Sequence, residues 1–154
     1  MRIIQAHKPE QIAMARELMR EYQLSLGVDL CFQNFEAELR DLPGSYAPPS
    51  GRLLLAIRDD DEVAGCVALQ ALDEHRCEMK RLYVRPNARG LGIGRALIDY
   101  VLNAAREIGY RSMVLDTLPS LRKAQELYER YGFTDIEPYR VNPLPGVRFL
   151  GRAL

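Results

Sequence analysis

The sequence predicts an α/β fold in which about four helices flank a mixed, mostly antiparallel sheet of six to seven strands. In the first half of the chain, short apolar runs at 53–57 and 63–72 are joined by a tight turn, as in antiparallel hairpins. In the second half, strand-like runs alternate with long helical patterns. A length of 154 residues suits one domain, so we expect residues 1–154 to form a single domain.

The first half begins with a strand predicted at 2–6 and a helix that starts near Pro9, because proline suits the first turn of a helix. Gly27 ends this helix, and a second, shorter helix is predicted at 32–42. Prolines and glycines at 43–51 indicate a loop. The apolar residues at helical spacing are Ile12, Ala15, Met19 and Tyr22 in the first helix and Phe32, Phe35 and Leu39 in the second.

The second half begins with a strand at 77–84, which runs into a glycine-rich segment and then a helix at 95–108. Gly109 is a suitable stop for that helix. A buried strand at 113–115 precedes a helix that we expect Ser120 to cap and Gly132 to end. Two closing strands are predicted at 134–139 and 148–153.

The glycine-rich segment, Arg89-Gly90-Leu91-Gly92-Ile93-Gly94, is the most informative part of the chain. Three alternate glycines let the backbone turn tightly and approach a ligand closely. The first amides of the following helix have no intrahelical partners, and the positive end of the helix dipole adds to their attraction for phosphate. Neither the dinucleotide pattern G-x-G-x-x-G nor a Walker loop fits, so the segment predicts a pyrophosphate site of another kind.

Two blocks of sequence resemble the acyl-CoA signature of the GNAT superfamily of N-acetyltransferases. The first is Lys80-Arg81-Leu82-Tyr83-Val84-Arg85-Pro86 followed by residues 89–94, and the second is Leu127-Tyr128-Glu129-Arg130-Tyr131-Gly132-Phe133. The resemblance implies a GNAT-like fold in which the fourth and fifth strands, here 77–84 and 112–117, splay apart. It also implies acetyl-CoA as cosubstrate, with its pantetheine arm in the gap between these strands.

The expected cofactor site is made mainly of backbone. The amides of the loop and of the first helical turn are the candidate pyrophosphate donors, with the side chain of Arg89 nearby. The resemblance implies that backbone groups of the fourth strand hold the pantetheine and polarise the thioester carbonyl. The predicted cofactor-binding residues are Leu82, Tyr83, Val84, Arg89, Gly90, Leu91, Gly92, Ile93, Gly94 and Arg95.

Tyr128 and Glu78 are the two predicted catalytic residues. Tyr128 matches the tyrosine that GNAT enzymes use as general acid on the departing thiolate, and its phenol is protonated at neutral pH. The alternative is a core tyrosine, since Tyr128 shares a helix face with Leu121 and Leu127. Tyr131 is interpreted as packing.

Glu78 is the candidate general base. Strict strand alternation places it on one face with Lys80, Leu82 and Val84. The alternative for Glu78 is a surface glutamate that pairs with a lysine or arginine. In that case, ordered water would be the base. Asp116, at the end of the fifth strand, is a candidate for binding the acceptor amine or for capping the next turn.

The acceptor site is less defined by the sequence. Leu121 stands where the family commonly has an asparagine near the pantetheine, which removes one side-chain contact to the cofactor. The segments expected to line the acceptor site contain Asp29, Phe32, Gln33, Phe35, Tyr139, Asn142 and Arg148. For Phe32, Phe35 and Arg148, core or surface roles are the favoured interpretations.

The resemblance implies an N-acetyltransferase that moves an acetyl group from acetyl-CoA to the primary amine of a small molecule or amino-acid-like acceptor by direct transfer. A protein or peptide acceptor, or a non-catalytic acyl-CoA-binding regulator, are the alternatives. Equal numbers of basic and acidic residues, 21 of each, argue against nucleic-acid and membrane partners.

Composition also bears on metal binding and on the expected cellular location. Cys31, Cys66 and Cys77 have no metal-ligand spacing, so we expect no metal. An odd cysteine count and an N-terminus without the pattern of a secretory leader favour a cytoplasmic protein. A homodimer is expected from the resemblance alone.

Overall fold

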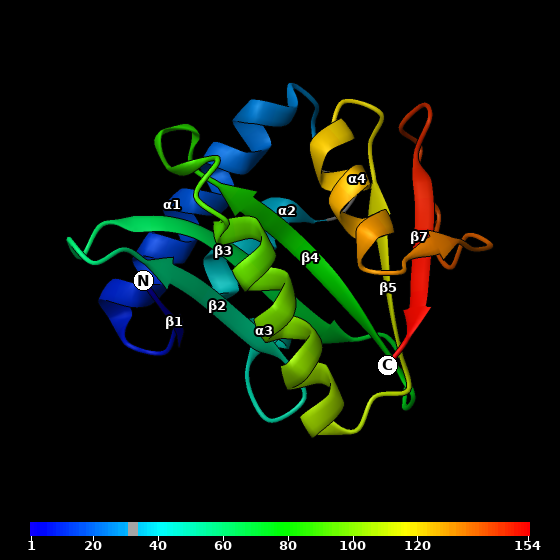
Figure 1. The fold of residues 1–154 in the computed structure, drawn as a ribbon, viewed down its shortest axis with the longest axis horizontal. Helices are drawn as coiled ribbons and strands as arrows, with labels where there is room; N and C mark the ends of the chain where they lie inside the picture. The colour runs from blue at the N-terminus through cyan, green and yellow to red at the C-terminus, as the bar shows by residue number, and fades with distance from the viewer. Residues whose placement is uncertain (31–33) are drawn as a thin grey trace.

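The computed structural model describes residues 1–30 and 34–154. A seven-stranded sheet has the order β1-β2-β3-β4-β5-β7-β6, and its helices lie on both faces (Figure 1). The predicted positions Cys31, Phe32 and Gln33 lie outside the described residues. The elements are β1 (Arg2–Gln5), α1 (Pro9–Leu26), α2 (Phe35–Asp41), η2 (Gly44–Tyr46), β2 (Arg52–Ile57), β3 (Val63–Ala71), β4 (Arg76–Val84), η3 (Pro86–Ala88), α3 (Ile93–Ile108), β5 (Ser112–Thr117), α4 (Arg122–Arg130), β6 (Thr134–Asp135) and β7 (Arg148–Ala153).

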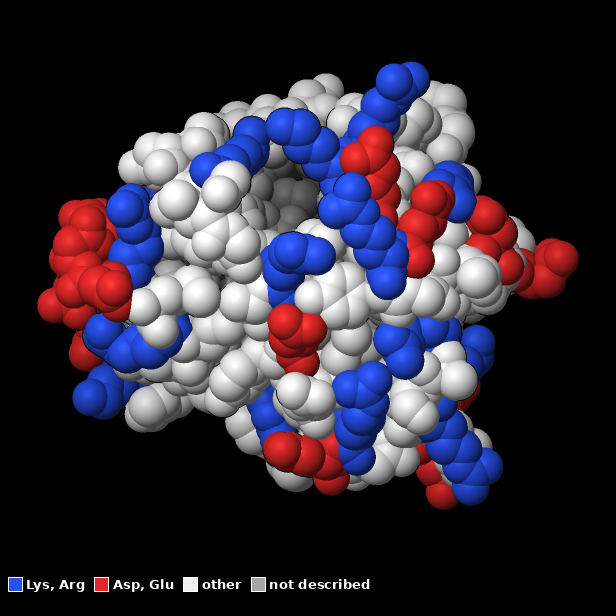
Figure 2. Space-filling view, viewed as in Figure 1, with Lys and Arg blue, Asp and Glu red and all other residues white. Residues whose placement is uncertain are grey.

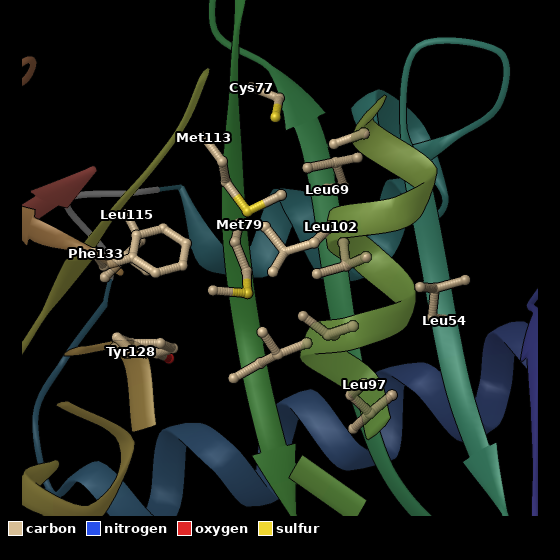
Figure 3. Packing of buried hydrophobic residues seen from close by; sticks show 14 of the residues in the cluster. Leu54, Leu69, Cys77, Met79, Leu97, Leu102, Met113, Leu115, Tyr128 and Phe133 are labelled. Atoms are coloured by element: carbon tan, nitrogen blue, oxygen red, sulfur yellow. The ribbon is translucent and has the colours of Figure 1, made fainter. Parts of the chain in front are cut away.

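Two hydrophobic clusters hold the layers together, one on each face of the sheet. Helix α3 places Leu97, Val101 and Leu102 against one face, where residues of β3, β4 and β5 complete the cluster (Figure 3). On the other face, α1 and α2 bury Leu18 and Phe35 against β2 and β3. Within the described residues, no helix is both long and apolar enough to cross a membrane.

Strands β4 and β5 diverge, as the resemblance implied. They pair in parallel only at Arg76–Glu78 of β4 and at 112–114 of β5, although β4 continues to Val84 and β5 to Thr117. The other strand pairs are antiparallel. The sheet therefore opens in its middle, beyond Glu78.

A β-bulge in β4 corrects one prediction. Ala68 of β3 lies opposite Lys80 and Cys66 lies opposite Tyr83, so two residues of β4 share one position of β3. Arg81, the first of the two, has a φ of 60°. The prediction that Glu78 and Lys80 share a face with Leu82 and Val84 is wrong, because the bulge shifts the alternation by one residue.

The burial pattern shows the consequence of the bulge. Cys77 and Met79 belong to the cluster under α3, and after the bulge Leu82 and Val84 pack against that same cluster. Tyr83 belongs to the cluster under α1 and α2. Glu78 and Lys80 therefore lie on the α1 and α2 face of the sheet, opposite to Leu82 and Val84.

Two element boundaries also differ from the prediction. Leu121, not Ser120, occupies the N-cap position of α4, and no side chain caps the helix there. The strand predicted at 134–139 ends at Asp135, because the chain then turns away from the sheet edge and carries Tyr139 to Glu78.

Candidate active site

The glycine loop connects the end of β4 to the start of α3. Gly90 has a φ of 81° and Gly92, the N-cap of α3, has a φ of 78°. A Cβ added at either position would meet no atom within 4 Å, so the backbone conformation, not crowding, requires glycine there. The open space around both residues leaves room for a ligand against the backbone.

The amide groups of this loop are available to bind an anion. Ala96 is the first residue whose amide closes the helix, onto the carbonyl of Gly92 at 3.1 Å. Within the described part of the chain, the amides of 90–95 donate to no protein acceptor. They lie at the positive end of the 16-residue helix α3, which attracts phosphate groups. The predicted pyrophosphate donors Leu91, Gly92, Gly94 and Arg95 thus have their amides available.

The side chains of the predicted cofactor residues have different surroundings. Arg89 is exposed and its Nε donates to the carbonyl of Val84 at 3.1 Å, which ties the loop to the end of β4. Leu82 lines the cavity described below. Tyr83 points to the other face, where its hydroxyl donates to Glu21 at 3.3 Å. Only backbone groups of Tyr83 could therefore face a cofactor.

A cavity of about 40 Å³ lies where β4 and β5 diverge. Figure 2 shows a hollow in the corresponding place of Figure 1, between the end of β4, the start of α3 and α4, with Lys and Arg side chains around it. The basic surroundings suit a polyanionic ligand. The cavity is lined by Tyr22, Met79, Lys80, Arg81, Leu82, Leu115, Asp116, Thr117, Leu121, Ala124 and Tyr128.

Tyr128 lines this cavity from α4 and also belongs to the hydrophobic cluster under α3 (Figure 3). Its ring packs edge-on against Phe133, with centroids 5.9 Å apart. Its hydroxyl has no hydrogen-bond partner among the described residues. Burial, and to a smaller extent Tyr22 and Asp116, raises the pKa of Tyr128 well above its ordinary value. The phenol therefore keeps its proton at neutral pH and has a donor available.

Glu78 is completely buried and lies outside the lining of this cavity. One carboxylate oxygen accepts from Tyr139 at 2.6 Å, and the other accepts from Gln70 at 2.9 Å and forms an ion pair with Arg140. Both oxygens are therefore engaged. A carboxylate with three donors is a firm anchor for the segment that carries Tyr139 and Arg140.

The segment 139–142, between β6 and β7, contacts both β4 and β5. Besides the contacts to Glu78, Asn142 donates to Asp116 Oδ2 at 3.2 Å. Sequence reasoning included Tyr139 and Asn142 among the acceptor candidates but missed Arg140. No sequence signal linked Arg140 to Glu78. The two residues are 62 positions apart in the sequence, and only the fold brings them together.

Two further acceptor candidates, Phe35 and Arg148, lie in structural contacts. Arg148 bonds Asp135 at 2.9 and 3.1 Å, Glu129 at 3.0 Å and Gln125 at 2.9 Å, so its guanidinium is engaged at the outer sheet edge. Phe35 is buried under the Arg81 guanidinium, 5.0 Å from its ring centroid. These contacts agree with the core and surface interpretations of Phe35 and Arg148.

Lys80 and Thr117 are polar residues of the cavity to which the sequence analysis assigned no role. Lys80 is only 8% exposed, and burial, followed by the charge of Arg81, lowers its pKa. Thr117 is 3% exposed, and its hydroxyl has no hydrogen-bond partner among the described residues. A lysine inside a strand expected to be buried is the sequence signal that could have indicated Lys80.

Comparison with known proteins identifies the family. The model of the acetyltransferase (GNAT) family matches residues 12–133. An uncharacterized N-acetyltransferase of Schizosaccharomyces pombe is 41% identical over 143 residues, which are 92% of this chain and 88% of that protein.

Solved structures have the same fold. A GNAT acetyltransferase from Staphylococcus aureus Mu50 aligns with a TM-score of 0.82 at 23% identity, over 99% of this chain and 98% of that one. A GNAT acetyltransferase from Elizabethkingia anophelis with acetyl-CoA bound aligns with a TM-score of 0.58 at 27% identity, over 68% of this chain and 77% of that one. Sequence blocks, divergent strands and relatives agree, and the chain belongs to the GNAT acetyltransferase family as an N-acetyltransferase.

Proposed function

We propose that residues 1–154 act as one domain that transfers an acetyl group from acetyl-CoA to the primary amine of a small, amino-acid-like acceptor. The observation that carries this proposal is the Tyr128 hydroxyl, which has no hydrogen-bond partner among residues 1–30 and 34–154 and whose residue lines the cavity between the diverging strands, where burial raises its pKa. A proton donor in that position suits direct transfer, in which a thiolate leaves.

The glycine loop supports acetyl-CoA as the cosubstrate. Acetyl-CoA occupies the Elizabethkingia anophelis relative, and the amides of 90–95 offer this chain's donors for its pyrophosphate. Backbone groups of Leu82, Tyr83 and Val84 would hold the pantetheine and polarise the carbonyl. An oxyanion donor of this kind contributes about 3 kcal/mol to transition-state stabilisation.

The proposed step conserves its protons. The acceptor nitrogen forms a bond to the thioester carbonyl carbon, and the bond from that carbon to sulfur breaks. The acceptor ammonium first loses one proton to a base, the nitrogen loses a second proton after it bonds to the carbonyl carbon, and Tyr128 gives its proton to the departing sulfur. Tyr128 is then reprotonated from solvent.

Glu78 and ordered water are the two candidate bases. Water has more support, because both Glu78 oxygens already accept hydrogen bonds and Glu78 does not line the cavity. Glu78 as a direct base requires that one of these contacts opens. The two routes differ in their pH profiles, since a direct carboxylate base gives an acid limb that Glu78→Gln removes.

The experiment is acetyl-CoA-dependent thiol release over amino acids, polyamines, aminoglycosides and short peptides. Release with one class of small amine would support the proposal and name the acceptor class. Release with peptides alone would indicate a protein acceptor. Silence across the panel, in a protein that acetyl-CoA still stabilises against heat, would indicate a non-catalytic acyl-CoA-binding protein.

The cytoplasmic location and the homodimer stay predictions. Fractionation of the source cells would test the cytoplasmic location. Size-exclusion chromatography with light scattering would test the homodimer.

A further inference from the structure

Arg81 has a backbone conformation that arginine rarely adopts. Its φ of 60° lies in the left-handed region, inside strand β4. Among the residues that the structure describes, the other non-glycine residues with a positive φ are Asn34 at the N-cap of α2 and Asp61 in the turn between β2 and β3. Asparagine and aspartate tolerate this region, and in a bulge whose first residue is left-handed that residue is usually glycine. Arg81 therefore needs contacts that hold it there.

The bulge at Arg81 sets the orientation of β4 along the cavity. Arg81 and Leu82 both line the cavity between the diverging strands, to which we assign the thioester. Leu82 and Val84 pack on the α3 face because the bulge shifts the alternation of β4 by one residue. Without the bulge, every later side chain of the strand would change face, and the backbone of 82–84 would turn with them.

Helix α2 holds the Arg81 side chain by two contacts. Glu38 accepts from its guanidinium at 2.8 and 2.9 Å, and the side chains are 4% exposed for Arg81 and 17% for Glu38. The ring centroid of Phe35, from the same helix, lies 5.0 Å from the guanidinium carbon. A guanidinium that is paired by two bonds and lies over an aromatic ring has a fixed orientation. Cys66 of β3 also donates to the Arg81 carbonyl, at 3.3 Å.

Helix α2 is itself tied to α1. Arg16 of α1 donates to the carbonyl of Leu39 at 2.8 Å, and Arg20 of α1 pairs with Glu36 at 3.1 Å. Glu36 forms an exposed pair with a helix, whereas Glu38 forms a buried pair with β4. Exposed pairs contribute little to stability, whereas removal of one partner from a buried pair is costly. Glu36 is therefore a matched control for Glu38.

We propose that Glu38 is a positioning residue for acetyl transfer. Through its ion pair with Arg81 it keeps the bulge of β4 in its left-handed form, and the bulge keeps the backbone groups of 82–84 against the thioester carbonyl. This inference rests on the proposed function and deepens it, because it links α2 to the groups that polarise the carbonyl. Glu38 itself contacts neither substrate nor cofactor, and it acts through backbone geometry alone.

The test replaces Arg81 by a residue that adopts the left-handed region without help. Two double variants are compared, Glu38→Gln with Arg81→Gly and Glu38→Gln with Arg81→Ala, so that neither keeps a buried charge without its partner. Glycine populates positive φ about as readily as negative φ, whereas alanine does not. Thiol release is measured with the amine that the wild type acetylates fastest.

The two double variants should differ in kcat. We expect the alanine variant to lose about tenfold or more, because misplaced contacts at the reacting centre are costly, and the glycine variant to stay within about threefold of the wild type. The KM for acetyl-CoA should change less than kcat, since the glycine loop is untouched. If the ion pair only stabilised the fold, the two folded variants would differ in melting temperature but not in kcat.

A second readout needs no acceptor. The infrared band of the thioester carbonyl moves to lower frequency when a donor polarises it, and isotope labelling of that carbon in acetyl-CoA separates the band from those of the protein. Binding to the wild type should lower the frequency relative to free acetyl-CoA. The glycine variant should keep this change and the alanine variant should lose most of it. Glu36→Gln, the control, should keep both the lowered frequency and the wild-type kcat.

The outcomes separate this inference from the proposed function. Equal kcat and equal carbonyl frequencies in the two double variants would overturn the role of Glu38 and leave the N-acetyltransferase standing. An unchanged frequency in the wild type would also overturn it, because no backbone group would then polarise the thioester. Silence with every amine would overturn the proposed function, and the carbonyl frequencies would still decide the role of Glu38.

Folding of the variants is checked by thermal unfolding. If the alanine variant alone fails to fold, the glycine variant decides: wild-type kcat and carbonyl frequency support the inference, and a loss of either overturns it. Failure of both double variants to fold would overturn a role confined to the bulge.

Discussion

The proposed cofactor half and the proposed acceptor half of this site are built in different ways. The cofactor half is one continuous segment, from Leu82 to Arg95, and it offers mainly backbone amides at the start of α3. The acceptor half combines side chains of α1, β4, β5 and the segment 139–142. A backbone site tolerates changes in most side chains, whereas a site made of side chains changes with each substitution. We therefore expect the first half to be shared across the family and the second half to differ with the acceptor.

Removal of the Tyr128 hydroxyl should have the largest effect, because Tyr128 lies where the two halves meet. Tyr128→Phe should lower kcat by about 10²-fold, within the usual range for a lost general acid. Stability should change by less than about 0.5 kcal/mol, since the hydroxyl bonds to none of the residues that the structure describes. Steady-state thiol release and thermal unfolding measure both quantities, and an unchanged kcat would remove Tyr128 as the acid.

The pH dependence of kcat in the wild type also tests Tyr128 as the general acid. Because burial raises the pKa of Tyr128, the phenol keeps its proton as pH rises through about 10, the ordinary tyrosine value. The kcat should therefore show no alkaline loss near that pH. A loss centred there, absent in Tyr128→Phe, would mean that the phenol is solvated during turnover.

Glu78→Gln should break the acceptor half while it leaves the cofactor half intact. It removes the charge that compensates partly buried Arg140, so we expect a loss of about 2–3 kcal/mol in the free energy of unfolding. The KM for the acceptor should rise, and the KM for acetyl-CoA should stay the same. The acid limb of the kcat profile should also stay in place.

Tyr139→Phe is the companion variant to Glu78→Gln. It keeps the Glu78 carboxylate but removes the hydrogen bond that holds the segment 139–142. A similar rise in acceptor KM in both variants would assign Glu78 a positioning role. An acid limb that disappears in Glu78→Gln alone would instead support Glu78 as the base.

Gly92→Ala should affect the cofactor half alone. At a φ of 78°, an alanine costs about 1–2 kcal/mol of backbone strain, which amounts to a roughly tenfold rise in the KM for acetyl-CoA if the loop shifts. Gly27→Ala is the matched control, since Gly27 has a φ of 66°, has similar open space and ends α1 away from the loop. Equal KM values in the two variants would argue against a role of the loop in acetyl-CoA binding.

Substitution of Arg148 should have the smallest effect on stability and on the two KM values. Its guanidinium bonds three partners at the outer edge of the sheet, where ion pairs are partly exposed. Arg148→Met should change stability by about 1 kcal/mol or less and leave both KM values unaltered. A selective rise in the acceptor KM, measured by thiol release, would return Arg148 to the acceptor site.

Sequence reasoning was most successful where the physics is local. The glycines at 90 and 92, the helix that follows them and the hairpin strands follow from periodicity and backbone conformation, and the structure confirms them. The splay of β4 and β5 came from the family resemblance. Tyr128 in the cavity lining agrees with its place in the second sequence block.

Sequence reasoning failed where distant segments decide the outcome. The bulge at Arg81 has a left-handed residue that is not glycine, and its ion pair with Glu38 of α2 accompanies that geometry. Glu78 gained partners from the segment 139–142, whose position no local pattern indicates. Lys80 and Thr117 became notable only once the divergence of the strands placed them in one cavity with Asp116.

The most direct measurement is acetyl-CoA-dependent thiol release by the wild-type protein with small primary amines, with the product identified by mass. We expect stoichiometric release of CoA and an acceptor whose mass rises by one acetyl group, with Tyr128→Phe slower by about 10²-fold under the same conditions. Binding of acetyl-CoA with no acetylated product from any amine would contradict the proposal that this site transfers an acetyl group to a small acceptor.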